Sequence, residues 1–336
     1  MKRVAINGFG RIGRMVLRAS LLNPFVSGEG EELEFVAIND LTDTKTLAHL
    51  FKYDSVHKTF EKDVRHTENS LIIDDKEIKV FSERDPEKLP WKELGIDIVV
   101  ESTGFFRTKE SAEKHITAGA KKVFLSAPPK GDGVKMFVRG VNEHEYNKET
   151  DHIVSNASCT TNCLAPMVKV LNDNFGVESG FMTTVHAYTG GQNLIDGPNK
   201  DLRRARSAAV SIVPTTTGSA KAVGVVIPAI AGKLDGMAMR VPVPDGSITD
   251  FVCVLRKETT AEEINKLFKS VAETHMKGVL QYSEEPLVSV DILTNSHSCI
   301  YDAPLTKVDR KLVKVVGWYD NEWGYSCRMV DMLKMM

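Results

Sequence analysis

The start of the chain constrains the fold most, because a glycine-rich turn stands there between a strand pattern and a helix pattern. Arg3–Asn7 is a short apolar run with β-branched residues, and residues 8–13, GFGRIG, follow it directly. Apolar residues then recur every three or four positions through Arg11–Leu22, as in an amphipathic helix. In this setting G-x-G-x-x-G is typical of dinucleotide-binding folds, since glycines allow a tight turn and helix-end N–H groups bind the pyrophosphate. The pattern predicts a dinucleotide site, with an ordinary turn as the alternative.

The same alternation of strand and helix patterns continues through the first half of the chain. Further strand-like runs occupy Glu34–Asn39, Asp97–Ser102 and Lys122–Ser126, and helical spacings occupy Thr42–Phe51 and Lys109–Ala118. Such alternation predicts a parallel sheet with crossover helices. Together with the glycine turn it indicates an N-terminal Rossmann domain.

After the short run Ile153–Asn156 the pattern changes to longer strands. These are Phe181–Thr189, Met237–Val243, Ser247–Leu255 and Val313–Trp318, with helical patterns at Thr160–Leu171 and Ala261–His275. Long strands of this kind favour an α+β domain with a large mixed or antiparallel sheet. We therefore expect an α/β protein with a dinucleotide-binding domain of residues 1–157, a catalytic domain of residues 158–319, and a final helix within 320–336 that returns to the first domain.

Composition limits the classes of partner. The 336 residues carry 43 Lys and Arg against 45 Asp and Glu, a formal charge of −2, so no strong field favours nucleic acid or an anionic membrane. The longest uncharged apolar stretch, Ala222–Gly232, is shorter than the roughly 18 residues of a membrane span, and the N-terminus has no apolar signal core. The five scattered cysteines form neither a disulfide scaffold nor a zinc pattern. We expect a soluble cytoplasmic protein with reduced thiols and no metal.

Asp40 is the residue expected to choose the cofactor. It ends the second predicted strand, where a carboxylate can accept hydrogen bonds from an adenosine ribose and would repel a 2′-phosphate, so it predicts NAD over NADP. Asp40 lies 27 positions after Gly13, beyond the usual roughly 20, and an acidic loop at Ser27–Glu32 accounts for the excess. The alternative role for Asp40 is to cap the next helix.

Cys159 is the candidate nucleophile. Ser158 is a credible N-cap for the helix pattern that follows, which puts Cys159 in the first turn. Unpaired N–H groups and the helix dipole there favour a thiolate. Cys163 lies one turn further on the same face, and it is either core packing or a partner that traps oxidised Cys159 as a disulfide.

A thiolate nucleophile needs a group that can move a proton near neutral pH, and imidazole is the usual choice. Among nine histidines, His186 stands out because it interrupts the apolar and β-branched run Phe181–Thr189. A core histidine bonded to backbone fits this context too. Spacing along the chain cannot pair His186 with Cys159.

Four motifs in order, GFGRIGR, ASCTTN, TTVHAYT and YDNEWGYS, together resemble glyceraldehyde-3-phosphate dehydrogenase, the phosphorylating glycolytic family. The resemblance runs from Arg3 to the final helix. It implies an NAD-dependent enzyme that converts D-glyceraldehyde 3-phosphate and inorganic phosphate to 1,3-bisphosphoglycerate. Cys159 would attack the aldehyde as His186 withdraws the proton, hydride would pass to nicotinamide, and phosphate would cleave the resulting thioester.

The resemblance also assigns binding roles to single residues. The substrate's phosphate would contact Thr189 and Arg240, and the attacking phosphate would contact Ser158, Thr160, Thr217 and Gly218, with Arg204 near both. Arg203 and Arg206 flank Arg204, so the choice among these arginines stays open. The cofactor residues would be Gly8, Gly10, Arg11, Ile12, Gly13, Asp40, Arg84, Thr103, Ser126 and Asn321. Without the resemblance, residues 215–218 would start a helix and the basic run would be a solvated face.

The polar loop Gly190–Ser207 is long for an idle connection. The resemblance places this loop at a subunit interface of a homotetramer, near the neighbouring cofactor. Gly197 departs from the family pattern, which has a leucine before the loop proline, here Pro198.

Three other functions stand as alternatives. Erythrose-4-phosphate dehydrogenase shares the fold, cysteine and histidine but releases its acid by hydrolysis, so it would not depend on phosphate. A non-catalytic binding protein, for instance for RNA, disagrees with the near-neutral charge and the lack of basic residues interleaved with aromatic ones. A thiol hydrolase would use the cysteine and histidine without reducing nicotinamide.

Overall fold

The chain folds into two compact units. The computed structural model describes residues 1–22 and 30–336, so the predicted acidic loop at Ser27–Glu32 lies partly outside the described residues. Unit 1 comprises Met1–Phe137, Glu143–Ala157 and Ser326–Met336, and unit 2 comprises Val138–Asn142 and Ser158–Tyr325.

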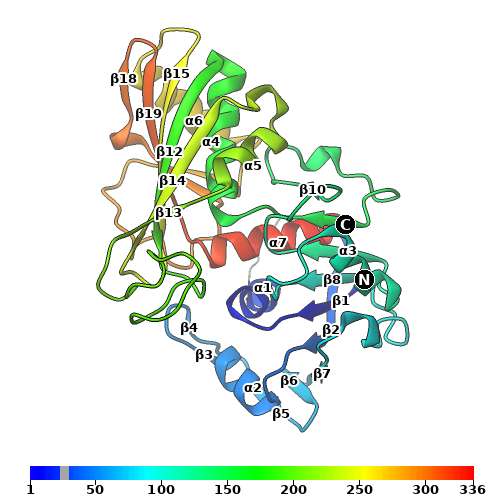
Figure 1. Ribbon diagram of the computed structural model, residues 1–336. Coiled ribbons are helices and arrows are strands. Elements are labelled where there is room, and N and C mark those ends of the chain that lie inside the picture. The colour runs from blue at the N-terminus through cyan, green and yellow to red at the C-terminus, as the bar shows by residue number, and fades with distance from the viewer. Residues whose placement is uncertain (23–29) are drawn as a thin grey trace. The chain divides into compact units, whose positions relative to one another are not determined.

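Unit 1 is built on a largely parallel sheet (Figure 1). Over the described residues the strand order is β10 (Lys135–Met136), β11 (Ile153–Ser155), β9 (Lys122–Leu125), β8 (Ile98–Glu101), β1 (Lys2–Asn7), β2 (Leu33–Asn39), β7 (Lys76–Phe81), β6 (Ser70–Ile73) and β5 (Val64–His66). Neighbours from β10 to β7 pair in parallel, and β6 and β5 are added antiparallel at the edge. Because β2 and β8 lie on opposite sides of β1, the sheet has the switch point at which open parallel sheets bind ligands.

Helices alternate with these strands as the sequence predicts. They are α1 (Arg11–Leu22), α2 (Thr44–Lys52) and α3 (Lys109–Thr117), with a small hairpin of β3 (Tyr53–Asp54) and β4 (Lys58–Thr59) after α2. α2 begins where the Asp43 carboxylate accepts a hydrogen bond from the Thr46 N–H, and α3 begins at a capping box. Most of the last helix, α7 (Trp323–Met335), belongs to unit 1. This arrangement confirms the predicted Rossmann architecture.

Unit 2 contains a mixed sheet (Figure 1). Its strand order is β13 (Val213–Thr216), β14 (Leu234–Val241), β12 (Val177–Ala187), β15 (Ser247–Leu255), β19 (Leu312–Tyr319), β17 (Cys299–Asp302) and β16 (Leu280–Ser283), and β18 (Lys307–Asp309) also pairs with β19. β12 pairs with β14, and β16 with β17, in parallel, while the other neighbours are antiparallel. The predicted α+β domain with a large mixed sheet is confirmed.

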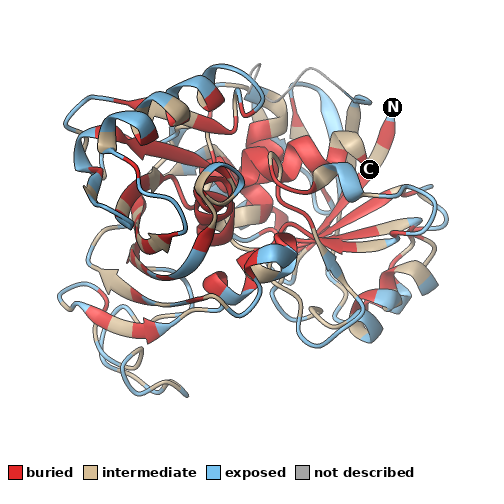
Figure 2. Cartoon of the chain, turned by 90° about the horizontal axis from the view of Figure 1, so that it is seen from above, coloured by how far each residue is buried: buried red, intermediate tan, exposed pale blue. Residues whose placement is uncertain are grey.

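Three helices cover this second sheet: α4 (Cys159–Phe175), α5 (Ser219–Val226) and α6 (Ala261–Glu273). α4 packs on β15, β17 and β19, and its Leu164, Met167 and Leu171 are fully buried. α4 is longer than predicted and ends at Gly176, whose φ of 73° is readily adopted only by glycine. Figure 2 shows the sheet strands largely buried and the connecting loops largely exposed.

Short elements escape the sequence prediction. β5 and β13, for example, span so few residues that no periodic pattern can be read from them. The alternative in which residues 215–218 start a helix is nearly met, since α5 begins at Ser219, although its residues are apolar on most sides and show no amphipathic pattern. In residues 1–22 and 30–336, no helix combines the length and the apolar character that crossing a membrane requires.

Candidate active site

Cys159 stands at the N-terminus of α4. Ser158 has extended backbone, and its Oγ accepts a hydrogen bond from the Thr161 N–H at 3.0 Å, so it is the N-cap. Cys159 is the first helical residue and is half-buried. Ala157, just before the cap, has a φ of 54°, a left-handed conformation that costs energy for alanine. A strained turn therefore places Cys159 at the start of the helix.

His186 lies beside this cysteine. It occupies β12, is 3% exposed, and places Nε2 at 3.5 Å from Cys159 Sγ. Its ring packs edge-on against Tyr319, with 5.8 Å between the ring centroids. The histidine is buried and its Nδ1 lies 2.7 Å from the Ala187 carbonyl, yet its other nitrogen faces the thiol. The packing of α4 on the sheet brings the two residues together.

The charge state of this pair differs from the sequence prediction. Burial raises the pKa of the Cys159 thiol to about 11, and the Arg240 guanidinium only partly opposes the rise. Burial, with the same guanidinium, lowers the pKa of His186 to about 3. In the protein without substrate this burial favours the thiol over the predicted thiolate, because the lost hydration of the sulfur opposes the helix terminus and the cation. The pair is a thiol and a neutral imidazole, and a neutral imidazole can act as a general base.

Arg240 is directly coupled to this imidazole. β12 and β14 pair with His186 opposite Arg240, so both side chains share one face of the sheet. Arg240 Nη1 lies 2.6 Å from His186 Nδ1 and donates to the Ala187 carbonyl at 2.9 Å. A guanidinium can only donate, so while Arg240 donates to Nδ1 the ring proton is on Nε2. For Nε2 to accept the thiol proton, Nδ1 must carry the ring proton and donate to the Ala187 carbonyl, which requires Arg240 to release Nδ1.

Three hydroxyls connect the N-termini of α4 and α5. Ser158 Oγ is 3.1 Å from Ser219 Oγ, and Thr217 Oγ1 donates to Ser219 Oγ at 3.0 Å. Gly218 is the N-cap of α5 and provides no side-chain cap for its first N–H groups. Two helix N-termini with a hydroxyl cluster suit an anion. Sequence reasoning missed Ser219, although it directly follows the run of threonines and glycine that the resemblance singled out.

Two predicted residues are held in place by buried hydrogen bonds. The Thr160 hydroxyl lies 2.9 Å from the Tyr319 hydroxyl. Asn321 Oδ1 accepts from Ser247 Oγ at 2.6 Å, and Ser247 Oγ accepts from the Ala187 N–H at 3.1 Å. Ser247, which sequence reasoning missed, thus joins Asn321 to the residue after the histidine.

The loop arginines differ in their partners. Arg206 is exposed and forms an ion pair with Asp196 at 3.1 Å, and Arg203 is exposed. Burial lowers the pKa of Arg240, and the charge of Arg204 adds to that lowering, so these two guanidinium groups act on each other. Of the three arginines, Arg204 is the one that this geometry favours for an anion near the thiol.

Thr189 and Arg204 lie on either side of the same glycine. A Cβ added to Gly191 would be 3.8 Å from Thr189 Oγ1 and 3.9 Å from Arg204 Nη1. Thr215 fixes the position of Arg204, because the Arg204 Nε donates a hydrogen bond to Thr215 Oγ1 at 2.9 Å. Thr189 is exposed. The two side chains can therefore reach a common ligand.

The glycine turn of unit 1 fits a dinucleotide. Gly8 has a φ of 91°, and a Cβ there would lie 2.7 Å from the Thr103 nitrogen, so no side chain fits. A Cβ on Gly13 would lie 2.3 Å from the Gly8 carbonyl oxygen, which shows how closely α1 follows the turn. A Cβ on Gly10 would meet nothing within 4 Å, so the backbone there is open to a ligand. The first turn of α1 carries no acidic residue and can receive a pyrophosphate.

Asp40 lies beside this turn. Its Oδ2 accepts from the Phe9 N–H at 2.8 Å, and its Oδ1 accepts from the Thr42 N–H at 3.0 Å. The alternative role of Asp40 as a helix cap is wrong, because Asp43 caps α2. Each Asp40 oxygen keeps a further lone pair with which to accept from a ribose hydroxyl.

The other predicted cofactor residues of unit 1 have varied surroundings. Arg11 forms an ion pair with Asp54; burial alone would raise the pKa of Asp54, but hydrogen bonds from Arg11 and the backbone hold it at about 2. Ile12 is half-buried and Arg84 is exposed. Ser126 directly follows β9 at the same end of the sheet as the turn after β8.

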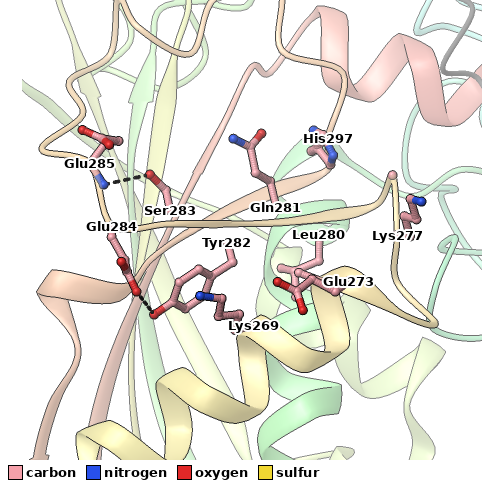
Figure 3. A pocket seen from close by; sticks show the side chains of 12 residues that line it. Lys269, Glu273, Lys277, Leu280, Gln281, Tyr282, Ser283, Glu284, Glu285 and His297 are labelled. Carbon is pink, nitrogen blue, oxygen red and sulfur yellow. Dashed lines mark hydrogen bonds between the residues drawn. The ribbon is translucent and has the colours of Figure 1, made fainter.

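A separate groove of about 510 Å³ lies between α6 and β16 (Figure 3). Its lining includes Lys269, Glu273, Lys277, Tyr282, Glu284 and His297. The Tyr282 hydroxyl donates to Glu284 at 2.9 Å, and the Lys269 ammonium lies 5.6 Å from the centre of the Tyr282 ring. None of the predicted site residues lines the groove. It is therefore not the candidate active site.

A thiol within reach of an imidazole, on a chain that also has a glycine turn at the switch point of a parallel sheet, defines an NAD-dependent oxidoreductase. Comparison with known families specifies which one. Residues 2–109 match the model described as glyceraldehyde 3-phosphate dehydrogenase, NAD binding domain, and residues 158–321 match the model for the C-terminal domain of that enzyme. The chain belongs to the glyceraldehyde 3-phosphate dehydrogenase family.

Relatives match over nearly the whole chain. The glyceraldehyde-3-phosphate dehydrogenase of Thermotoga maritima is 58% identical over 337 residues, which cover 100% of this chain and 99% of the relative. That of Geobacillus stearothermophilus is 57% identical over 331 residues, 98% of this chain and 96% of the relative. Glyceraldehyde-3-phosphate dehydrogenase 2 of Bacillus subtilis is 56% identical over 334 residues, 99% and 96% of the two chains. The family confirms a glycolytic, NAD-dependent dehydrogenase and does not favour erythrose-4-phosphate dehydrogenase.

Proposed function

We propose that Cys159 is the nucleophile and His186 the general base in the conversion of glyceraldehyde 3-phosphate, NAD and inorganic phosphate to 1,3-bisphosphoglycerate. The observation that carries the proposal is the 3.5 Å approach of Cys159 Sγ to His186 Nε2 at the N-terminus of α4. A neutral thiol beside a neutral imidazole can pass one proton as the sulfur attacks.

The proposed reaction begins when Cys159 Sγ adds to the aldehyde carbon. The thiol proton passes to His186 Nε2 and from there to the aldehyde oxygen, which gives a thiohemiacetal. NAD, when bound, supplies the acceptor for the hydride that leaves this carbon. His186 takes the hydroxyl proton in that step and leaves a thioester on the sulfur. A phosphate oxygen then attacks the thioester carbon, the S–C bond breaks, and His186 returns the proton to the sulfur.

The two phosphates are proposed to bind at different groups. The groups proposed to bind the substrate's own phosphate are Thr189 and Arg240. The groups proposed to bind the attacking phosphate are Ser158, Thr160, Thr217 and Gly218. Arg204 is proposed to contact both phosphates. A phosphate on Arg240 would offset the positive charge that lies 2.6 Å from His186 Nδ1 and lowers the pKa of the imidazole. Substrate binding would thereby make His186 a stronger base.

The cofactor is proposed to lie along the switch-point edge of the unit 1 sheet. The residues proposed to contact it are Gly8, Gly10, Arg11, Ile12, Gly13, Asp40, Arg84, Thr103, Ser126 and Asn321. The open backbone at Gly10 and the lack of an acidic residue in the first turn of α1 support the pyrophosphate position. The proposed role of Asn321 is to hold the nicotinamide amide in one orientation, and its bond to Ser247 supports this role.

Asp40→Ala tests the cofactor assignment. Removing the carboxylate deletes an acceptor for the ribose and a charge that repels a 2′-phosphate. We expect the ratio of kcat/KM for NAD to that for NADP to fall by at least roughly tenfold. Asp43→Ala is the matched control, since it removes the same charge nearby but affects only the cap of α2. A ratio that is unchanged in the Asp40 variant, or that falls equally in both, would contradict the assignment.

Dependence on inorganic phosphate tests the function as a whole. With glyceraldehyde 3-phosphate and NAD, steady formation of NADH should require phosphate, because only phosphate cleaves the thioester rapidly. Without phosphate, we expect one equivalent of NADH per active site and then a slow phase limited by hydrolysis. Turnover indifferent to phosphate would instead indicate an acid-releasing enzyme of the erythrose-4-phosphate type. Absence of NADH with intact substrate turnover would indicate a thiol hydrolase.

A homotetramer in the cytoplasm is the proposed assembly and location. Residues 194–212 present Leu194, Ile195, Leu202, Val210 and Ile212, which are 63–81% exposed in the single chain. Apolar side chains gathered in one segment favour burial against a further subunit. None of the five cysteines, all within the described residues, forms a disulfide, which agrees with a reducing cytoplasm. Light scattering should give four times the 37.2 kDa chain mass; a monomer mass would contradict the assembly.

A further inference from the structure

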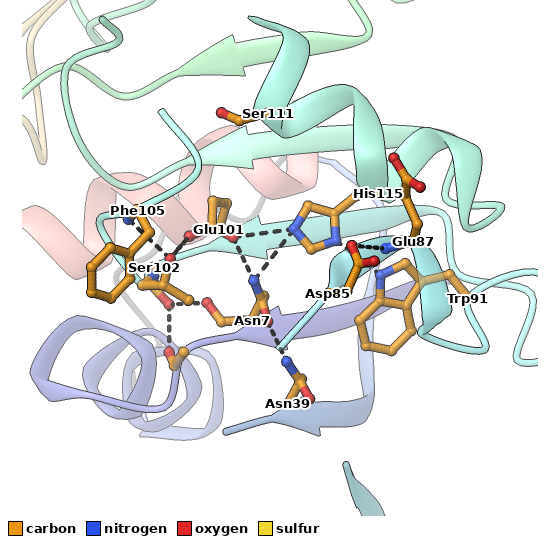
Figure 4. A network of polar contacts seen from close by, with 12 residues as sticks. Asn7, Asn39, Asp85, Glu87, Trp91, Glu101, Ser102, Phe105, Ser111 and His115 are labelled. Atoms are coloured by element: carbon orange, nitrogen blue, oxygen red, sulfur yellow. Dashed lines mark hydrogen bonds and ion pairs between the residues drawn. The ribbon is translucent and has the colours of Figure 1, made fainter. Parts of the chain in front are cut away.

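A buried polar chain adjoins the glycine turn of unit 1 (Figure 4). It runs from Trp91 to His115 on α3 and on to Glu101 at the end of β8. Trp91 and His115 are 0% exposed and Glu101 is 3% exposed. None of the three belongs to the predicted site. Buried acids and imidazoles destabilise a fold unless their polar atoms are hydrogen-bonded. Each hydrogen bond in this buried network therefore contributes to stability.

The indole of Trp91 selects the tautomer of His115. Trp91 Nε1 donates to His115 Nδ1 at 3.0 Å, and an indole N–H can only donate. Nδ1 must therefore accept, so the ring proton is on Nε2. Nε2 lies 3.1 Å from Glu101 Oε2 and donates to it. Trp91 and Glu101 thus select the same tautomer, with the ring proton on Nε2.

Glu101 uses all of its acceptor sites. Oε2 accepts from His115 and, at 2.6 Å, from Asn7 Nδ2. Oε1 accepts from the Thr103 N–H at 2.8 Å and also from the Thr103 hydroxyl. A carboxylate offers about four lone-pair sites, so these donors occupy the whole group. A side chain with fewer acceptors could not hold them all.

The residues that donate hydrogen bonds to Glu101 lie next to the glycine turn. Asn7 immediately precedes Gly8, and its Oδ1 accepts from Asn39 Nδ2 at 2.7 Å, at the end of β2. The Thr103 nitrogen lies 2.7 Å from the position of a Cβ on Gly8. A shift of Asn7 or Thr103 would therefore change the space on both sides of Gly8. Figure 4 shows that the hydrogen bonds continue from Glu101 through Asn7 to Asn39 at the end of β2.

We propose that Glu101, His115 and Trp91 are positioning residues that set the affinity for the dinucleotide. The proposal rests on the assignment of Gly8 and Thr103 to the cofactor. Its physical basis is preorganisation: a saturated carboxylate holds the segment after β8 in one place against the turn, so binding does not have to order it. The thiol and imidazole of the reaction belong to unit 2. Changes to the three positioning residues should therefore alter the affinity for NAD and leave the rate of the chemical step nearly unchanged.

Glu101→Gln tests the proposal with a side chain of the same size. Whichever way the amide points, its NH₂ meets donors, either at Asn7 and His115 or at Thr103. We expect the dissociation constant for NAD, measured by calorimetry on the full chain, to rise roughly 10- to 100-fold. At saturating NAD, kcat should change by less than about threefold. A dissociation constant within about twofold of wild type would overturn the proposal.

Val99→Ala is the matched control for general destabilisation. Val99 is fully buried in the same strand, β8, and its side chain makes no hydrogen bond. The control should lower Tm at least as much as Glu101→Gln while the dissociation constant for NAD stays near the wild-type value. An equal rise in both variants would show that a loosened sheet, rather than the polar chain, sets the affinity, and would overturn the proposal.

Trp91→Phe gives a second test that does not depend on how well Glu101→Gln folds. Phenylalanine keeps an aromatic ring against Phe81 but removes the N–H, so only the bond from Nε2 to Glu101 still restrains the tautomer of His115. Nitrogen-15 NMR should find the Nε2 tautomer of His115 in wild type and an increased share of the Nδ1 tautomer in the variant, and the dissociation constant for NAD should rise roughly 3- to 10-fold. An unchanged tautomer with unchanged affinity would overturn the role of Trp91. Failure of wild type to bind NAD would instead refute the proposed function.

Discussion

Cys159→Ser is expected to eliminate the first-turnover burst of NADH. A serine hydroxyl is a far weaker nucleophile than a thiol unless a strong base activates it. Here burial lowers the pKa of the neighbouring imidazole to about 3, and so weak a base removes a proton far less readily from a hydroxyl than from the more acidic thiol. The rate of the burst, followed by stopped-flow absorbance after mixing enzyme and NAD with glyceraldehyde 3-phosphate, should fall by at least ~10³-fold.

Cys163→Ser is the control for that experiment, because it makes the same change one turn further along α4. The Cys163 thiol is fully buried and donates to the Gly317 carbonyl at 3.6 Å, a bond that a hydroxyl can also make. Burial raises the pKa of this thiol well above its usual range, which favours a packing role over disulfide exchange. The control should keep a burst of one NADH per site. A burst that survives Cys159→Ser, or that is lost in Cys163→Ser, would refute the nucleophile assignment.

His186→Asn should slow the same burst by ~10²- to 10⁴-fold, the usual contribution of a general base. The pH dependence identifies the role. In wild type without substrate the imidazole is unprotonated above about pH 3 and the thiol keeps its proton below about pH 11. The second-order acylation rate at low substrate concentration, which reports the free enzyme, should therefore be nearly flat from pH 5 to 9. Without the base only the rare thiolate reacts, so the rate of the variant should rise about tenfold per pH unit over that range. A flat profile in the variant, or a wild-type inflection near pH 6.5, would contradict the assignment.

The same histidine should make the fold sensitive to acid. Its pKa is about 3 in the native state and about 6.5 when unfolded, so between these values the unfolded chain binds more protons. Stability is therefore complete above the unfolded pKa and falls as pH decreases below it, by about 2 kcal/mol at pH 5 relative to pH 8. His186→Asn should lack this part of the acid destabilisation in urea unfolding measured at both pH values. An identical pH dependence in the two proteins would argue against the depressed pKa.

Much of the fold was predictable because its patterns are local. The strand before Gly8, the helix Arg11–Leu22 and the alternation through residue 126 all lie where the sequence indicates, since apolar spacing and capping act over a few residues. The predicted strands of the second half also form, with ends shifted by a few residues. The short strands could not be predicted, because their existence depends on neighbours supplied by distant parts of the chain.

The site was predicted unevenly for the same reason. The cap and helix-terminal place of Cys159 follow from neighbouring residues, and the structure has both. The thiolate was predicted from that helix terminus and a nearby imidazole, and the prediction omitted the desolvation by which packing raises the pKa of the thiol. Ser219 and Ser247 were missed, since a lone serine shows no pattern until its partners are known.

Residue type and local order were enough to identify a dinucleotide turn, a nucleophile at a helix terminus and, through four motifs, the family. Which of the nine histidines faces the sulfur, which loop arginine acts on Arg240, and whether the thiol carries a charge were decided only by tertiary packing. These properties depend on the hydration that side chains lose on burial and on contacts between residues far apart in the chain. A local sequence pattern predicts neither of them.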